Sequence, residues 1–471
     1  MTRVPLYKTR RIAVAMSGGV DSSVAAYLLQ QNPCHSLLGL FMSNWSTHDD
    51  DDDDSHNNKN NKNNNNHRRH CHEVDYHDAQ RTCEHLGLPP LQYASFAKEY
   101  WTHVFEPFVS TIAGGHATPN PDCDCNAHIK FGAMKEYAQD KLGVDWIATG
   151  HYARLYHRNN HDQQPLPEGF EDWMLETTHP HDFDTNDNDD DVAPLLLSGV
   201  DESKDQSYFL ATVNGKAFRN VIFPLGHLYK SKNANNTIKT PTVRQLAHQA
   251  NLPTASKRES MGICFVGKRN FSQFISQYLP QQPPRGHFIN VENGSILGDH
   301  KGSWHYTIGQ GAKISGADQK WFVVQQTKDA VVVCPGTHHA SLFANQVTLQ
   351  SMHWIGGCIP PPLLKEGYLR IACRPRHLQP KMTGTLQWNH HSNTYTIDFD
   401  GPVRALTPGQ IAVLYIGSVC LGGGHILSSG PSYHEMGLEL PKTLHPSGHN
   451  DLSVLKQDIQ QVQSRSLGYQ T

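Results

Sequence analysis

The fold is decided by a short glycine-containing turn, Ser17-Gly18-Gly19-Val20-Asp21-Ser22-Ser23. An apolar run at residues 12–16 is typical of a strand, and residues 22–31 after the turn are typical of a helix. Glycines let backbone amides approach phosphate oxygens, and the N-terminus of a helix favours an anion. The turn lacks the Gly-Lys-Ser/Thr ending of a Walker loop. We therefore predict a phosphate-binding loop of another kind.

Strand and helix patterns alternate outward from this turn. Strand-like apolar runs lie at 36–42, 91–96 and 145–149, and helical patterns lie at 78–86, 97–112 and 127–141. This order predicts βαβ units, and hence an α/β domain with a parallel sheet over residues 1–219. Ligands of such sheets bind beyond the carboxyl ends of the strands, which is where the turn falls.

The rest of the 471 residues predicts two further domains and a tail. Helices dominate 220–289, a small central domain, in which one helix should begin with Thr240 as N-cap and Pro241 at the first helical position. Regularly spaced short strands then predict a C-terminal β-barrel over 290–428. These strands are expected at 321–326, 331–334, 368–374, 385–388 and 394–399. Residues 429–471 show no clear pattern and are expected to form a tail.

Two polar segments interrupt the α/β pattern. Residues 49–70 begin with six consecutive Asp and continue with Asn, Lys and His, while 157–191 is rich in Asp, Asn, His and Pro. Such compositions cannot bury a core, so both are expected to be disordered surface insertions. Metal binding by their His and Asp residues remains an alternative.

Composition restricts the compartment and the partners. The net charge of −4 means that any nucleic acid must be held by a local basic patch. Ten cysteines are too few for a disulfide scaffold, and the absence of a long apolar run argues against a membrane. The first acidic residue is Asp21, and the basic start with Arg3 and Lys8 suggests an organellar address. We expect a mitochondrial protein, with the cytoplasm and the plastid as alternatives.

The turn resembles the pyrophosphate loop of the adenine-nucleotide α-hydrolase fold, the Rossmann-like PP-loop ATPases, which split ATP between the α- and β-phosphates. The resemblance implies ATP with Mg²⁺ held near Asp21. It also implies phosphate contacts from the loop, which comprises Ser17, Gly18, Gly19, Val20, Asp21, Ser22 and Ser23. Met42 would lie against the adenine and Gly150 would flank the nucleotide. A helix-capping role for the serines and a core role for Met42 remain open.

Two cysteine-containing strings form the second signal. They are Asn120-Pro121-Asp122-Cys123-Asp124-Cys125-Asn126 and Gly262-Ile263-Cys264-Phe265-Val266-Gly267. Sulfur transfer requires one cysteine to carry a persulfide and another to resolve the disulfide that remains, so two separated thiols fit it. Alternatively, Cys123 and Cys125 could bind zinc or an iron–sulfur cluster with Cys71, His72 or His128.

With the loop, these strings resemble the tRNA-specific 2-thiouridylase family, which has bacterial and mitochondrial members. Further matching strings are Phe41-Met42-Ser43-Asn44-Trp45, Ala148-Thr149-Gly150-His151-Tyr152, Lys204-Asp205-Gln206-Ser207-Tyr208-Phe209-Leu210, Tyr306-Thr307-Ile308-Gly309-Gln310 and Cys420-Leu421-Gly422-Gly423-Gly424. The resemblance implies a sulfurtransferase that adenylates the C2 oxygen of the wobble uridine and replaces it with sulfur. Cys264 would receive the persulfide, Cys125 would attack it, and Asp122 would be the acid/base group. Cys123 is then an extra thiol.

The same resemblance implies contacts with the tRNA anticodon stem-loop and a persulfide sulfur donor protein as a second partner. The implied substrate-binding residues are Asn120, Pro121, Lys204, Asp205, Gln206, Arg376 and His377. Base chemistry requires the uridine to leave its stack. The chain departs from the family after Gln310, where Gly311 replaces an Arg and Lys313 follows.

Two rival functions remain at this point. One is another PP-loop tRNA thiolase with a metal cluster, which would not need Cys264 in its Gly-Ile-Cys-Phe setting. The other is a tRNA-binding protein that has lost catalysis, which the intact Asp21, Asp122, Cys125 and Cys264 argue against.

Overall fold

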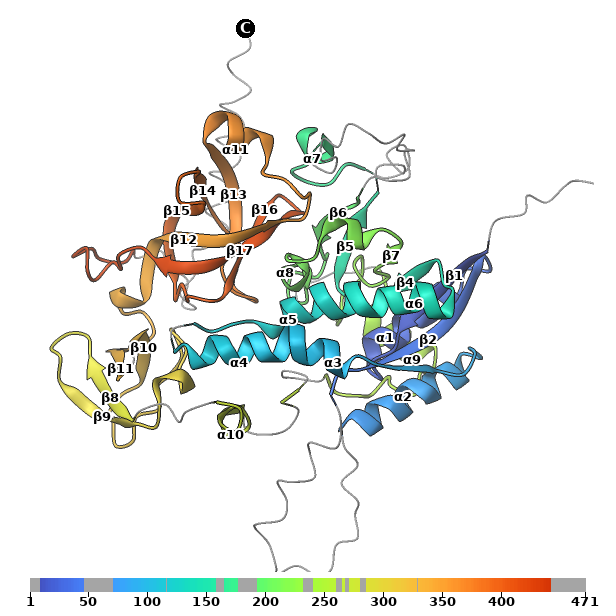
Figure 1. Ribbon diagram of the computed structural model, residues 1–471, viewed down its shortest axis with the longest axis horizontal. Coiled ribbons are helices and arrows are strands. Elements are labelled where there is room, and N and C mark those ends of the chain that lie inside the picture. The colour runs from blue at the N-terminus through green and yellow to red at the C-terminus, as the bar shows by residue number, and fades with distance from the viewer. Residues whose placement is uncertain are drawn as a thin grey trace, which may run out of the picture.

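The computed structural model describes residues 9–45, 71–115, 117–157, 165–176, 193–231, 240–259, 265–266, 271–279, 285–327 and 329–441. Figure 1 shows a parallel sheet with helices in blue to green, a small sheet in yellow and a β-barrel in orange to red. This confirms the predicted fold class, an α/β domain followed by a central domain and a C-terminal barrel. Residues 221–222 and 243–249, which were expected in the central domain, instead belong to the parallel sheet and one of its covering helices. Within the described ranges, no helix is long and apolar enough to cross a membrane.

A five-stranded parallel sheet forms the α/β domain. Its order is β3-β2-β1-β4-β7, with β1 (Arg10–Ala15) at the centre. The other strands are β2 (His35–Ser43), β3 (Gln92–Ser95), β4 (Trp146–Ala148) and β7 (Val221–Ile222). The strand order reverses between β1 and β4, and ligands of open parallel sheets bind at such a switch point.

Side chains of β1 alternate between two hydrophobic cores, as the period of two in a strand requires. Ile12 and Val14 pack with helices α1 (Val20–Gln30), α2 (Cys71–His85) and α9 (Val243–Gln249), whereas Ala13 faces the opposite core. That second core is covered by α3 (Ala97–Tyr100), η2 (Trp101–Phe105), α4 (Glu106–Ala113), α5 (Pro121–Asp124), η3 (Cys125–Ala133) and α6 (Met134–Leu142). The stretches η2 and η3 are π-helical, so the helices predicted at 97–112 and 127–141 are present but irregular.

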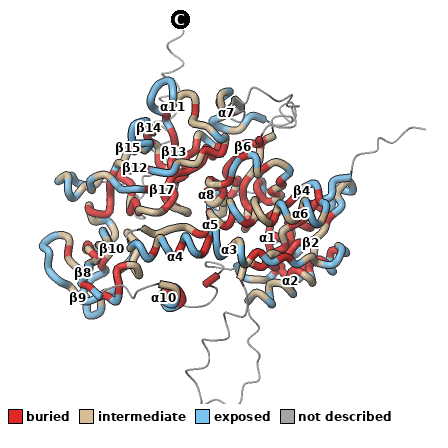
Figure 2. The backbone as a smooth tube through the Cα atoms, viewed as in Figure 1, coloured by how far each residue is buried: buried red, intermediate tan, exposed pale blue. Residues whose placement is uncertain are grey.

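Six antiparallel strands close into the C-terminal barrel. Its order is β12-β15-β14-β13-β16-β17, and β12 pairs with β17 to complete the ring. The strands are β12 (Phe343–Trp354), β13 (Tyr368–Arg374), β14 (Met382–Asn389), β15 (Thr394–Arg404), β16 (Ile411–Ile416) and β17 (Val419–Ser429). A hairpin from the α/β part of the chain, β5 (Ala153–Tyr156) with β6 (Leu195–Ser198), extends the barrel sheet through the pair Leu197 and Val419. Figure 2 shows burial along both the parallel sheet and the barrel.

The central region contains helices and a separate four-stranded sheet of order β10-β11-β8-β9. Its strands are β8 (Gly286–Asn290), β9 (Ile296–His300), β10 (Trp321–Gln326) and β11 (Ala330–Pro335). The sequence placed β10 and β11 with the barrel, but their valines pack with Phe288 in a core of their own. Six further short helices lie between residues 207 and 366. They are α8 (Ser207–Leu210), η6 (Gly215–Phe218), α10 (Phe271–Ser276), η7 (Ser303–His305), η8 (Ala340–Leu342) and α11 (Pro361–Glu366).

The N-cap of helix α9 is Thr242, not the predicted Thr240. The Thr242 hydroxyl accepts a hydrogen bond from the Gln245 amide at 3.3 Å, and the Gln245 side chain accepts one from the Thr242 amide at 3.0 Å. Such a reciprocal capping box satisfies two amides that the helix itself leaves unpaired, so the helix begins there.

Two expectations about polar segments need correction. Part of 157–191 is packed: α7 (Trp173–Glu176) places Met174 at 1% exposure in the barrel core, and Phe170 lies 6.2 Å from the Tyr156 ring. Residues 430–441 of the expected tail also fold back, with the Tyr433 amide donating to the Phe343 carbonyl at 2.9 Å. Both segments contain enough large apolar side chains to pack. Residues 49–70, most of 157–191 and 442–471 lie outside the described residues.

A buried ion pair joins the barrel to the α/β domain. The Arg374 guanidinium donates to Asp205 at 3.0 Å, and the two side chains are only 7% and 1% exposed. Asp205 also accepts hydrogen bonds from the amides of Gly199 and Ser207, both at 3.0 Å, and from the Ser207 hydroxyl. Removing either partner therefore leaves the other charge in an apolar interior.

We expect Arg374→Met to lower the free energy of unfolding by about 3–5 kcal/mol, because the Asp205 carboxylate is left buried without its cation. Urea denaturation followed by fluorescence measures the change. Arg370→Met is the matched control, since the Arg370–Asp400 pair is 55% and 40% exposed and such pairs contribute about 0–1 kcal/mol. Equal losses in the two variants would contradict a special role for the buried pair.

Candidate active site

The loop that follows β1 requires glycine where it approaches helix α2. Gly18 has φ +69°, and a Cβ atom there would lie 2.1 Å from the carbonyl oxygen of Asp75 on α2. Gly150, after β4, approaches the same loop so closely that a Cβ atom would lie 3.0 Å from the Ser22 amide nitrogen. Both glycines therefore serve close packing at the carboxyl edge of the sheet. Met42 near the end of β2 is half-buried at this edge and packs against the core, so its contact with adenine stays a prediction.

The three serines of the loop are not equivalent. The Ser22 hydroxyl accepts from the Ser17 amide at 3.2 Å and lies 3.1 Å from the Ser17 hydroxyl. Ser23 is fully buried; its hydroxyl donates to the Gly19 carbonyl at 2.8 Å and accepts from Thr254 at 2.9 Å. The predicted phosphate contact of the Ser23 side chain is therefore corrected, because this hydroxyl bonds inside the protein.

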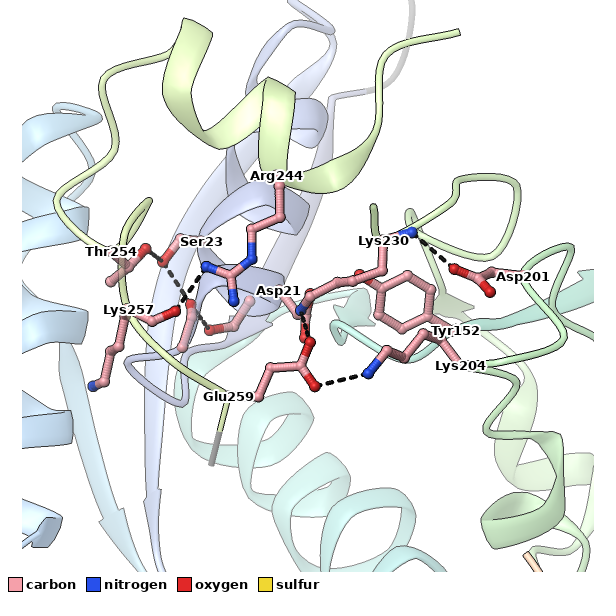
Figure 3. Close-up of polar contacts among 12 residues, drawn as sticks. Asp21, Ser23, Tyr152, Asp201, Lys204, Lys230, Arg244, Thr254, Lys257 and Glu259 are labelled. Carbon is pink, nitrogen blue, oxygen red and sulfur yellow. Dashed lines mark hydrogen bonds and ion pairs between the residues drawn. The ribbon is translucent and has the colours of Figure 1, made fainter. Parts of the chain in front are cut away.

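Asp21 lies in the first turn of α1, beside the loop (Figure 3). Its Oδ1 accepts a hydrogen bond from the Tyr152 hydroxyl at 2.7 Å and one from the Lys230 ammonium at 2.5 Å. The Asp21 side chain remains 34% exposed. Among the described residues, the hydrogen bonds to this carboxylate all reach Oδ1, so Oδ2 is the oxygen available to a cation.

A segment far along the chain covers this loop. Thr254 bonds to Ser23, and Lys257 donates to the Gly18 carbonyl at 2.9 Å. Lys257 also pairs with Asp75 at 2.7 Å and Asp78 at 2.5 Å on α2, and these carboxylates keep its pKa raised despite the opposing effect of burial. Residues 254–257 therefore connect the loop to α2, because Lys257 contacts both.

The cysteine string forms a capped helical turn. The Asn120 side chain accepts from the Asp122 amide at 3.2 Å, and Pro121 occupies the first helical position of α5. Cys125 is 5% exposed, and the side-chain nitrogen Nδ2 of Asn44, after β2, lies 3.9 Å from its sulfur. Asn44 and the loop both follow parallel strands, so Cys125 lies at the same edge of the sheet as the loop.

Burial separates the roles of the neighbouring groups. Cys123 is fully buried against the Tyr208 carbonyl, and burial raises its pKa well above the usual thiol value. Burial also raises the pKa of Asp122, partly offset by Lys130, and raises the pKa of Asp124 to about 6. Carboxyl groups with raised pKa values beside a cysteine are typical of sites that move protons.

Cys264 lies outside the described residues, but its chain neighbour Phe265 is placed. Phe265 is 2% exposed, and its ring centroid lies 6.1 Å from that of Trp45 and 5.1 Å from that of Phe105. Trp45 directly follows Asn44, whose amide contacts Cys125. Phe265 is therefore anchored beside the strand end that contacts Cys125.

The described part of the chain contains no group of three His, Cys, Asp or Glu side chains arranged to hold a metal ion. The two sulfurs of the Cys-x-Cys string contact different elements, Cys123 the Tyr208 carbonyl and Cys125 the Asn44 amide. The alternative of a metal site built on both thiols thus gains no support from these residues.

The predicted substrate-binding residues fall into two groups. Lys204 is partly exposed, and its ammonium pairs with Glu259 at 2.8 Å near the loop. Asp205 faces the opposite way into its buried pair with Arg374, so its predicted contact with tRNA is corrected. The Gln206 side chain accepts a hydrogen bond from the Tyr152 amide at 3.0 Å and thereby positions the residue that bonds Asp21.

The barrel residues are also engaged with the protein. Arg376 donates to the Ile308 carbonyl at 3.3 Å and to Thr407 at 2.6 Å. His377 packs on Phe209 with ring centroids 4.2 Å apart, and burial with the nearby Arg374 lowers its pKa to about 4. Both lie beside the string after Lys204, but a role in binding tRNA stays a prediction. At the departure from the family, Gly311 bridges to Phe322.

Sequence reasoning missed Lys230, Lys257 and Glu259. Lys230 and Lys257 bond to loop residues that lie 209 and 239 positions earlier in the chain, and Glu259 reaches the site through Lys204 and Lys230. Tyr152 ends the family-like string at 148–152, but nothing in the sequence indicates its hydrogen bond to Asp21. These residues became visible only when the structure brought them together.

Models of three domain families match the chain in order. They are described as the tRNA methyl transferase HUP domain, matching residues 10–268, the tRNA methyl transferase PRC-barrel domain, matching 272–335, and the aminomethyltransferase beta-barrel domain, matching 344–426. The second match coincides with the separate four-stranded sheet. Fold and loop together define a HUP-domain nucleotide-binding protein with two appended β-domains.

Relatives specify the family. Mitochondrial tRNA-specific 2-thiouridylase 1 of Gallus gallus is 35% identical over 96% of this chain and 98% of the relative, and that of Homo sapiens is 38% identical over 91% and 92%. The tRNA-specific 2-thiouridylase MnmA of Psychrobacter cryohalolentis is 38% identical over 89% and 91%. The chain therefore belongs to the tRNA-specific 2-thiouridylase family.

The raised pKa of Asp124 gives a stability prediction with a definite sign. A buried carboxyl whose folded pKa is about 6, against 3.8 when exposed, destabilises the fold once it ionises. We expect Asp124→Asn to raise the free energy of unfolding by about 3 kcal/mol above pH 6, a gain that fades as pH falls from about 6 to 4. Denaturant unfolding at a series of pH values measures it.

Asp140→Asn on the exposed side of α6 is the control and should change stability by less than about 0.5 kcal/mol. A pH-independent effect of Asp124→Asn would show that ionisation of this carboxyl is not opposed by its surroundings.

Proposed function

We propose that the protein is an ATP-dependent tRNA 2-thiouridylase. It adenylates the C2 oxygen of the wobble uridine and replaces that oxygen with sulfur from a cysteine persulfide, releasing pyrophosphate and AMP. The observation that carries the proposal is the convergence of the loop, Asp21 and Cys125 at one edge of the sheet, with the Cys264 neighbour Phe265 anchored beside Asn44. Family membership supports the same activity.

The nucleotide half of the reaction depends on positioning. The loop amides at the start of α1 would receive phosphate oxygens, and Asp21 would hold Mg²⁺ through Oδ2, since its hydrogen bonds from the described residues all reach Oδ1. When bound, magnesium neutralises charge on the phosphates and the leaving pyrophosphate. Tyr152 and Lys230 hold the Asp21 carboxylate in a fixed orientation throughout.

The sulfur half uses the two thiols in sequence. The terminal sulfur of the Cys264 persulfide forms a bond to C2, and the bond from C2 to the adenylated oxygen breaks to release AMP. The Cys125 thiolate then attacks the Cys264 sulfur, which leaves the base sulfur as 2-thiouridine and a Cys125–Cys264 disulfide. A dithiol reductant must reduce that disulfide, and a persulfide donor protein must reload Cys264.

Asp122 suits proton transfer in this sequence. Its raised pKa lets the carboxyl hold a proton closer to neutral pH than an exposed Asp does. Lys204, the Asn120-Pro121 turn, Arg376 and His377 are the proposed contacts to the anticodon stem-loop. The mitochondrial names of the eukaryotic relatives support a mitochondrial location.

The mechanism predicts different defects for the three cysteines. Cys264→Ser should accept no persulfide and form no 2-thiouridine, whereas Cys125→Ser should accept the persulfide and fail to complete transfer. Cys123→Ser should retain most activity, because that thiol is fully buried and contacts the Tyr208 carbonyl. Radiolabelled sulfur loading of the protein, combined with mass spectrometry of tRNA nucleosides, distinguishes the steps.

Elemental analysis of the same variants tests the rival site. Stoichiometric zinc or iron that disappears from both Cys123→Ser and Cys125→Ser would replace the disulfide mechanism with a metal-dependent one. Wild-type activity in Cys264→Ser would refute the persulfide assignment.

A further inference from the structure

Lys230 places a buried positive charge at the nucleotide loop. Its side chain is 4% exposed, and the ammonium lies 2.5 Å from Asp21 Oδ1, 3.7 Å from Glu259 Oε1 and 5.7 Å from the centre of the Tyr152 ring (Figure 3). The Lys230 backbone amide donates to the buried carboxylate of Asp201 at 2.9 Å. Asp201 in turn accepts from the Ser203 amide and hydroxyl, so the start of the side chain is fixed.

Lys257 provides a comparison beside the same loop. An ammonium group has three donors, and Lys257 uses them on Gly18, Asp75 and Asp78. Among the described residues, the ammonium of Lys230 makes one hydrogen bond, to Asp21, since 3.7 Å to Glu259 exceeds hydrogen-bonding distance. All three donors of the Lys257 ammonium are thus used within the protein, whereas the Lys230 ammonium retains donors for a further acceptor.

The Glu259 carboxylate lies near the ammonium groups of two lysines. It pairs with Lys204 at 2.8 Å and lies near Lys230, and these cations, Lys204 first, lower its pKa. The two carboxylates Asp21 and Glu259 balance the two ammonium groups of Lys230 and Lys204, so none of these four side chains adds an uncompensated charge to the group. A phosphate chain adds negative charge beside an ammonium with donors to spare.

We propose that Lys230 binds the phosphate chain of the nucleotide, and that Glu259 competes with the phosphates for its ammonium group. This inference rests on the proposed use of ATP. It adds a phosphate-binding residue from outside the loop and a carboxylate that weakens nucleotide binding. Removing the Lys230 charge should therefore weaken binding of the phosphates without affecting the nucleoside, and removing the Glu259 charge should strengthen it.

Isothermal titration calorimetry on the full chain tests this with Mg-ATP and with adenosine as probes. Lys230→Met should raise the Kd for Mg-ATP at least about tenfold and leave that for adenosine unchanged, because its ammonium acts on the phosphates and not on the nucleoside. The same loss for ATP in the presence of EDTA is expected, since it does not depend on the Mg²⁺ that Asp21 would hold. Glu259→Gln should lower the Kd for Mg-ATP about threefold, and Lys230→Arg should retain most of the affinity. Lys216→Met, at an exposed position on η6, is the control and should bind as wild type.

Three outcomes would overturn the proposal. They are an unchanged Kd for Mg-ATP in Lys230→Met, an equal loss for ATP and adenosine, which indicates a structural role, and weaker ATP binding in Glu259→Gln. Because Glu259→Gln removes one partly exposed charge, it tests the proposal even if Lys230→Met unfolds. Wild-type protein that binds no Mg-ATP would instead refute the proposed function, and the role of Lys230 with it.

Discussion

The buried carboxylate of Asp205 is the constraint on which the rest of the structure depends. It accepts hydrogen bonds from two backbone amides, one hydroxyl and the guanidinium of Arg374, so it fixes the 199–207 connection and the barrel at once. The residues on either side of it contact neighbours of the nucleotide loop. Lys204 pairs with Glu259, and Gln206 accepts a hydrogen bond from the Tyr152 amide. One buried ion pair thereby positions both the barrel and the residues that contact the nucleotide loop.

Much of the fold could be predicted because local chemistry and tertiary structure agree in it. The apolar run before Ser17, the glycines after it and the alternating patterns up to residue 149 identified a parallel sheet with its loop at the carboxyl edge. Strands 321–326 and 368–374 were also predicted at their observed positions. Their assignment to sheets was less accurate, because strand pairing depends on partners far away in the sequence.

The errors share a physical cause. The family resemblance implied that Asp205 contacts tRNA, and nothing in its string indicates the partner Arg374, which lies 169 residues away. Ser23 was treated like Ser22, although the step of one residue along the helix turns its hydroxyl to another face, where it accepts from Thr254. The network around Lys230 was missed for the same reason. The role of a charged residue depends on its partners, and these lie far away in the sequence.

The pairing of β6 with β17 has a consequence for how the chain is made. Leu197 and Val419 are separated by about 220 residues, so a ribosome working at about 5–20 residues per second exposes the β5–β6 hairpin for some 10–45 seconds before its partner strand emerges. During that interval the edge of the hairpin can pair with other chains. Within the protein, this edge of β6 is covered only after Val419 has been synthesised.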